Sequence, residues 1–124
     1  MFIKQIILLP FLLAFATVPA NANELLDSYT ARLSIEDHFN TDGVRLKSAA
    51  AIIRQDRAHF HKFGIRDRED TYDSVFGSIS NRNTLEKMLN NGQISNSARQ
   101  AVVNGTPLIR VNIYTNSVDV LVID

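Results

Sequence analysis

Residues 44–63 read VRLKSAAAIIRQDRAHFHKF, which is the longest helical pattern in the chain. At about 100° per residue, its apolar side chains fall on one arc of a helix. The members of this arc are Leu46, Ala49, Ala50, Ile53 and Phe60, with Phe63 at its edge. Gly64 follows directly and suits a left-handed C-terminal cap, and Thr41 or Asp42 is expected to cap the start. The pattern predicts a central helix with one face against the core.

Two charged residues of this helix, Asp56 and Arg57, lie on the flanks of the apolar arc, where an unpaired charge is costly to bury. Arg54 and His61 fall close to Arg57, so the three form a cationic stripe along one edge. Two interpretations stay open. In the first, which we prefer, Asp56 and Arg57 tie the helix to a loop or strand through structural ion pairs. In the second, Arg54, Arg57 and His61 bind an anionic ligand or a partner.

Residues 1–22 have the features of a secretory signal peptide. Lys4 supplies a positive start, residues 6–18 are almost entirely apolar, and Ala20-Asn21-Ala22 has the small-x-small pattern of a cleavage site. A membrane-spanning helix needs about 20 apolar residues, which is more than this run provides. We therefore expect cleavage after Ala22, no stable membrane anchor after cleavage, and a periplasmic or secreted location.

Residues 23–124 are expected to form a single globular domain, because this length suits one modest core and no linker or repeat interrupts it. The chain has no cysteine, so an exported domain must be held together by packing without disulfides. The full chain has 13 Lys and Arg against 13 Asp and Glu. This neutral balance gives no reason to expect nucleic acid or an anionic membrane as a partner. The sequence leaves the oligomeric state open.

Alternating apolar residues and capping signals predict the remaining elements. Strand patterns cover residues 28–34, 108–114 and 118–123, and the last two are joined by a short turn typical of a β-hairpin. Further helices are expected over residues 68–79, 83–90 and 95–104. The sequence therefore predicts an α+β fold of two layers, with about four helices on a three-stranded antiparallel sheet that ends in a C-terminal β-hairpin.

The side chains show no pattern typical of a known catalytic or metal site. There is no cysteine nucleophile, no Gly-x-Ser-x-Gly turn and no glycine-rich phosphate loop. His59 and His61 would point about 160° apart on a helix, which is too far to share a metal. The alternating polar residues from Asp67 to Asp73 resemble a calcium loop, but Tyr72 stands where such a loop needs glycine. We predict neither a metal nor a cofactor.

Two classes of function follow. The preferred one is a non-catalytic module that binds a protein or peptide in the periplasm, through an exposed hairpin strand or the edge formed by Arg54, Arg57 and His61. The alternative is a small hydrolase or nuclease that acts on an anionic substrate through Asp37 and His38. In that alternative, Arg54, Arg57 and His61 assist. We prefer binding, because catalysis needs several groups held together and no spacing in the sequence achieves this. An open cleft shared by His38, Arg57 and His61 would favour the enzyme instead.

Overall fold

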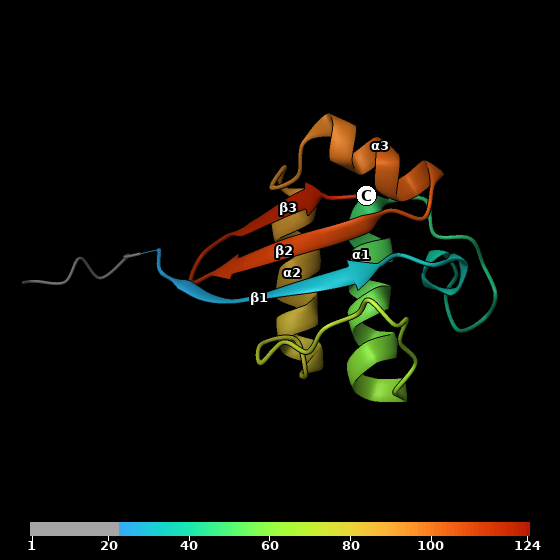
Figure 1. Ribbon diagram of the computed structural model, residues 1–124, viewed down its shortest axis with the longest axis horizontal. Coiled ribbons are helices and arrows are strands. Elements are labelled where there is room, and N and C mark those ends of the chain that lie inside the picture. Colours follow the sequence, from blue (N-terminus) through green and yellow to red (C-terminus); the bar gives the residue numbers. More distant parts are fainter. Residues whose placement is uncertain (1–22) are drawn as a thin grey trace, which may run out of the picture.

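The computed structural model describes residues 23–124 of the chain. The expected signal peptide, residues 1–22, lies outside the described residues. A three-stranded antiparallel sheet forms one layer of the domain (Figure 1). Its strands are β1 (Leu25–Arg32), β2 (Leu108–Tyr114) and β3 (Val118–Val122), with β2 in the centre. The antiparallel pair β2 and β3 lies at the C-terminus, close to where the hairpin was expected.

Helices form the second layer and lie on one side of the sheet (Figure 1). Within residues 23–124 there are three α-helices, α1 (Ala49–Ala58), α2 (Ile79–Asn90) and α3 (Asn96–Asn104). A 3-10 turn, η1 (Ile35–His38), follows β1, and a π-helical turn, η2 (His59–Phe63), extends α1. The domain is therefore α+β, as predicted. None of its described helices is long and apolar enough to cross a membrane.

The core lies between the two layers. Tyr29 of β1 stands opposite Val111 of β2, which stands opposite Val120 of β3, so the three strands direct alternate side chains toward the helices. The helices supply a second set of buried apolar side chains, namely Ile52, Ile53, Leu85, Leu89 and Val102. The Tyr29 and Phe76 rings meet edge to face, with centroids 6.1 Å apart. Phe76 thus joins the core from the segment that precedes α2.

A capping serine directly precedes each α-helix. The side chains of Ser48, Ser78 and Ser95 accept hydrogen bonds from the backbone N–H of the residue three positions on, at 3.1, 3.1 and 3.2 Å. These caps satisfy one of the N–H groups that a helix start leaves without an intrahelical partner. Ser95 was the expected cap of α3, whereas Ser48 and Ser78 were not anticipated.

The central helix is shorter than the sequence predicted. It begins at Ala49 and not at Val44. Residues 44–48 are instead held by contacts with the loop before them. Arg45 forms an isolated antiparallel bridge with Phe39, and the Leu46 N–H donates to the His38 carbonyl at 2.8 Å. The far end agrees with the prediction, since Gly64 has a φ of 66° in the left-handed region.

The helix expected over residues 68–79 does not form, which is why the domain has three α-helices and not four. This segment runs along the outer edge of β1, where the Thr71 N–H donates to the Thr30 carbonyl at 2.9 Å. The Thr71 hydroxyl oxygen accepts from the Thr30 N–H at 2.8 Å, and Asp70 accepts from the Arg32 N–H at 2.8 Å. Pairing with the sheet thus replaces the hydrogen bonds of a helix. α2 starts at Ile79, earlier than the predicted Asn83, with Ser78 as its capping residue.

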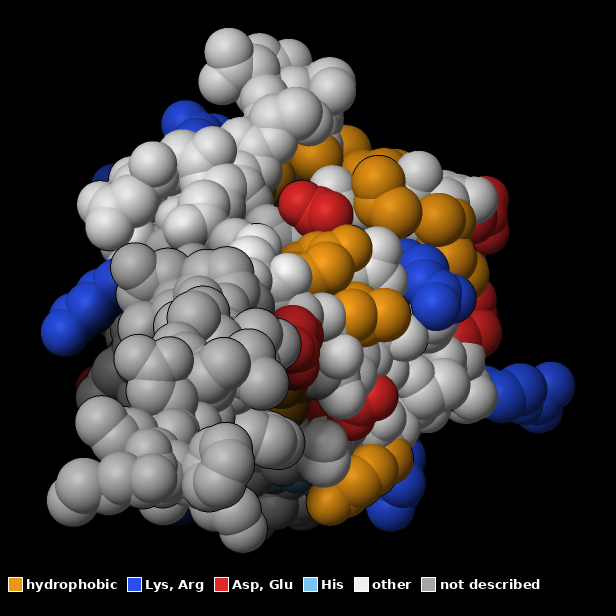
Figure 2. Space-filling model, turned by 90° about the vertical axis from the view of Figure 1, so that its left-hand side faces the viewer, with side chains coloured by type: hydrophobic (Ala, Val, Ile, Leu, Met, Phe, Trp, Pro, Cys, Tyr) orange, Lys and Arg blue, Asp and Glu red, His pale blue; other side chains and the backbone are white. Residues whose placement is uncertain are grey.

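The surface carries both signs of charge. Figure 2 shows acidic, basic and hydrophobic side chains interleaved over the described residues on one side of the molecule. Exposed apolar side chains occur at the start of β1 and along the end of β3, namely Leu25, Leu26, Leu121, Val122 and Ile123. The exposed residues at the end of β3 belong to the β3 edge, which is described below as part of the candidate site.

Candidate functional site

Arg57 lies inside the core, and its side chain is 0% exposed. Its Nε donates to Asp56 Oδ2 at 2.8 Å, and its Nη1 donates to Asp73 Oδ1 at 2.9 Å and to the Thr71 carbonyl at 3.1 Å. The guanidinium carbon lies 3.8 Å from the centre of the Tyr29 ring. Arg57 therefore ties α1 to the 64–78 segment and presents no group to solvent.

Asp73 is the second centre of this buried network. Its Oδ1 also accepts a hydrogen bond from His61 Nε2 at 2.6 Å, and its Oδ2 accepts from the backbone N–H groups of Val75 and Phe76. Burial opposes ionisation of Asp73, but the donors, led by His61, hold the pKa of this carboxyl below its ordinary value. Since His61 belongs to the same network, it serves the packing of the 64–78 segment.

Asp37 and His38 are neighbours in the chain but have different partners. Asp37 Oδ1 lies 2.8 Å from His59 Nδ1, and the other His59 nitrogen lies 3.2 Å from the Gln55 amide nitrogen. His38 is 2% exposed, and its two ring nitrogens each lie 2.8 Å from a carbonyl oxygen, of Ser34 and of Val102. A carbonyl only accepts, so both contacts are hydrogen bonds only when both nitrogens carry protons. His38 thus joins η1 to the last turn of α3.

Arg54 faces away from this network. Its Nη1 pairs with Glu86 at 3.0 Å, and its Nη2 donates to the Asn83 side chain. The expected cationic stripe is therefore divided: Arg57 and His61 meet at Asp73, whereas Arg54 lies between α1 and α2. His38, Arg57 and His61 are all buried or nearly so, and they do not share an open cleft.

Arg82 is a buried charge that sequence reasoning missed. It is 5% exposed, and its Nη1 donates to the Phe76 and Gly77 carbonyls at 3.0 and 3.1 Å. The signal was present in the sequence, because Arg82 shares the helical stripe of Leu85 and Leu89 and therefore faces inward.

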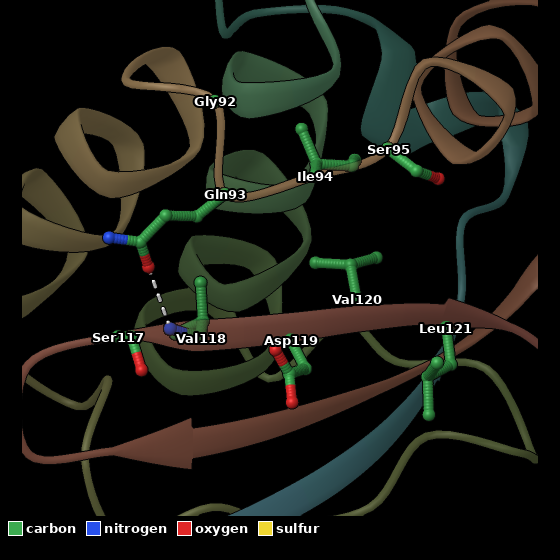
Figure 3. A pocket seen from close by; sticks show the side chains of 9 residues that line it. All are labelled: Gly92, Gln93, Ile94, Ser95, Ser117, Val118, Asp119, Val120 and Leu121. Atoms are coloured by element: carbon green, nitrogen blue, oxygen red, sulfur yellow. Dashed lines mark hydrogen bonds between the residues drawn. The ribbon is translucent and has the colours of Figure 1, made fainter. Parts of the chain in front are cut away.

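The outer edge of β3 is an edge of the sheet that no other strand covers within the described residues. Tyr114 N–H donates to the Ser117 carbonyl, so by antiparallel alternation the backbone groups of Val118, Val120 and Val122 point away from β2. The Gln93 side chain accepts from the Val118 N–H at 2.9 Å. Figure 3 shows this bond, and shows the segment from Gly92 to Ser95 running alongside β3. No hydrogen bond within residues 23–124 uses the outward groups of Val120 and Val122.

Two hollows border the same edge. The first, of about 400 Å³, lies between the Gly92–Ser95 segment and residues 117–121, and the second, of about 470 Å³, lies between Val122 and the end of α3. In Figure 3, Val118 and Val120 point toward the Gly92–Ser95 segment, whereas Asp119 and Leu121 point away from it. The edge therefore has space beside it, in which an extended chain has room to lie.

The described residues contain no group of three or more His, Asp or Glu placed to hold a metal ion. Comparisons with known protein families, with characterised proteins and with solved structures found no match to this chain. The class of protein is therefore defined by its own features, an α+β domain with a buried Arg57 network and an open β3 edge.

The buried carboxyls make stability depend on pH. Burial raises the pKa of Asp37 to about 7 and that of Asp56 to about 8, above the ordinary value of 3.8. The folded chain then binds these two protons more tightly than the unfolded chain does. Their stabilisation is complete below about pH 3.8 and is lost as the pH rises through about 7 and 8. We expect the melting temperature to fall over this window, as measured by circular dichroism.

Asp56→Asn is the variant to compare with the parent, because asparagine does not titrate and the pKa of Asp56 is raised further than that of Asp37. The melting temperature of this variant should fall less steeply with pH than that of the parent. The depressed pKa of Asp73 acts in the opposite sense, so its stabilisation is lost only in stronger acid. A parent protein that becomes more stable between mild acid and mild alkali contradicts the prediction.

Proposed function

We propose that the exported domain is a non-catalytic module that binds an extended segment of a periplasmic protein or peptide along the outer edge of β3. The observation that carries this proposal is the row of outward backbone groups at Val120 and Val122 that lacks partners within the described residues. An extended peptide placed there adds a fourth strand to the sheet through main-chain hydrogen bonds. A strand edge of this kind is a template for pairing with another chain.

The two edges of the sheet differ in a way that supports this assignment. The edge of β1 is covered by the 64–78 segment, through the Thr30–Thr71 bonds and the bond from the Arg32 N–H to Asp70. At β3 a single side chain, that of Gln93, covers one N–H group. β3 carries one charged residue, Asp119, and no proline, so it has few of the features that normally prevent edge pairing.

Side-chain contacts supply selectivity in this mode of binding. Leu121 and Val122 are 48% and 41% exposed, so an apolar partner side chain gains by covering them. The two hollows along this edge give room for alternate side chains of the peptide. We therefore expect bound segments to be extended and to carry apolar residues at alternate positions.

The enzyme alternative has less support. It required Asp37 and His38 to act together, with Arg54, Arg57 and His61 near the substrate. The Asp37 carboxyl lies against His59, both nitrogens of His38 are engaged with carbonyl groups, and Arg57 has no exposed surface. A general base must reach the proton that it removes, and these groups face the interior.

The test uses peptides selected from a displayed random library on the chain that starts at Asn23. In Val120→Pro the lost N–H points away from β2, so the sheet keeps its own hydrogen bonds. We expect this change to weaken selected peptides at least about tenfold, since it removes a main-chain donor and blocks close approach. Bound peptide should also slow hydrogen exchange at the Val122 amide.

Arg110→Gln is the matched control, because Arg110 is exposed on β2 and bonds only to Ser28 and Asn112 on the open face. This variant should bind as the parent does. Failure to select any peptide overturns the proposal, and so does equal binding by Val120→Pro and the parent.

A further inference from the structure

A third hollow, of about 360 Å³, lies between α1, α2 and the loop that contains Asn40 and Thr41. Three basic side chains line it, Arg54 from α1, Lys62 from η2 and Arg82 from α2. One acidic side chain, Glu86, lines it as well. Since Glu86 pairs with Arg54, the lining has an excess of positive charge at Lys62 and Arg82.

Arg82 is the unusual member of this lining. Arginines buried to this extent are normally paired with a carboxylate, because an unpaired charge is costly to remove from water. Arg82 makes no ion pair within residues 23–124, and its two hydrogen bonds go to neutral carbonyls through Nη1 alone. Its Nε and Nη2 have no partner among the described residues, and neither is sealed from solvent. Three N–H donors of a buried guanidinium, one on Nε and two on Nη2, therefore remain unused beside the hollow.

The surroundings of Arg82 strengthen the case for an anion. Burial, and secondarily the nearby charge of Arg54, lower the pKa of the Arg82 guanidinium. Two guanidinium groups of like charge repel each other, and an anion placed near both removes this repulsion. Guanidinium groups bind carboxylates and phosphates through paired N–H donors, and the unused Nε and Nη2 of Arg82 form such a pair.

Three of the remaining lining residues are polar, Asn40, Thr41 and Gln55, and the others are apolar. The apolar walls are formed by Leu46, Ala51, Ala58, Phe63 and Ile79. We infer that this hollow between α1 and α2 binds a small organic oxyanion, with its carboxylate or phosphate group held by Arg82 and Lys62 and a short apolar body against these walls. This site is separate from the β3 edge, so it adds a ligand class to the proposed peptide binding.

The test is a titration of the chain from Asn23, followed by calorimetry and by amide NMR shifts. The probes are hexanoate, phenyl phosphate and neutral 1-hexanol. We expect saturable binding of at least one anion, weakened by added salt, with shifts concentrated at residues lining the hollow. Hexanoate binding alone assigns a carboxylate ligand, and phenyl phosphate binding alone assigns a phosphate ligand.

Two variants make the test decisive. Arg82→Gln should weaken the bound anion at least about tenfold, in keeping with the loss of a charge-assisted hydrogen bond. Because Arg82 also holds two carbonyls before α2, the exposed Lys62→Gln is tested beside it and should weaken binding without lowering the melting temperature. Lys87→Gln, exposed on α2 outside the hollow, should bind as the parent does. Absence of saturable anion binding, equal binding of 1-hexanol, or unchanged binding by both variants overturns the inference.

Discussion

Replacing Arg57 by Ala is expected to lower the free energy of unfolding by about 3–5 kcal/mol, the range for breaking a buried ion pair by removing one partner. The change leaves Asp56 and Asp73 buried without their shared guanidinium, and both are almost fully enclosed. It also opens a void against the Tyr29 and Phe60 rings, which the guanidinium covers at 3.8 and 4.5 Å. Urea denaturation at about pH 9, where Asp56 is ionised in the folded chain, measures the loss.

Two further variants separate this effect from the general loss of an arginine. Arg57→Lys should recover part of the stability, because an ammonium keeps the charge but cannot reach two carboxylates with a planar fork. Arg54→Ala should lower the free energy of unfolding by no more than about 1 kcal/mol, since its pair with Glu86 is partly exposed. If Arg57→Ala unfolds at the same urea concentration as the parent, the Arg57 network is not a main source of stability.

The elements that local sequence determines were predictable. β2 alternates apolar and polar side chains, and β3 is apolar at every position except Asp119; such patterns specify strands wherever one face is buried. α3 has a serine at its start and Gly105 directly after its end, so both boundaries were readable. In these cases the nearest neighbours in the chain carry the signal.

The 68–79 segment shows where local patterns fail. Tyr72, Val75, Phe76 and Ile79 have helical spacing, but Tyr72 is 69% exposed and Phe76 is 1% exposed. The segment instead bonds to the edge of β1, where the Thr71 N–H donates to the Thr30 carbonyl and the Asp70 side chain accepts from the Arg32 N–H, about forty positions earlier in the chain. A periodic pattern in a short segment does not reveal whether a sheet edge is nearby and lacks a partner.

In the candidate site, too, local sequence determined some features and contacts between distant parts of the chain determined others. Helical spacing placed Arg54, Arg57 and His61 along one edge, but it did not give the depth of each side chain. Arg57 is enclosed because β1 and the 64–78 segment close over it, whereas Arg54 is covered only in part by α2. The hollow beside Arg82 depends on how α1 packs against α2, and this packing cannot be predicted from a local sequence pattern.

Asp73→Ala is expected to lower the free energy of unfolding by about 3 kcal/mol or more, because one carboxylate satisfies several buried donors. Its loss leaves part of the Arg57 charge without a partner and frees the N–H groups of Val75 and Phe76 from their acceptor. It also removes the partner of His61. Hydrogen exchange at the Val75 and Phe76 amides should accelerate more than exchange in β2, since the 64–78 segment loses its anchor before the sheet opens.

Asp73→Asn is the matched variant for the charge. Asn keeps one acceptor oxygen but replaces the other with an N–H donor, which must face either the guanidinium of Arg57 or the two backbone N–H groups. We therefore expect Asp73→Asn to lie between the parent and Asp73→Ala in urea denaturation. His61→Gln should have the smallest effect of the three, because it removes one donor and leaves Asp73 bonded to Arg57 and to the backbone. An unchanged exchange rate at Phe76 in Asp73→Ala would show that the packing of the Phe76 ring, and not the carboxylate, holds this segment against the core.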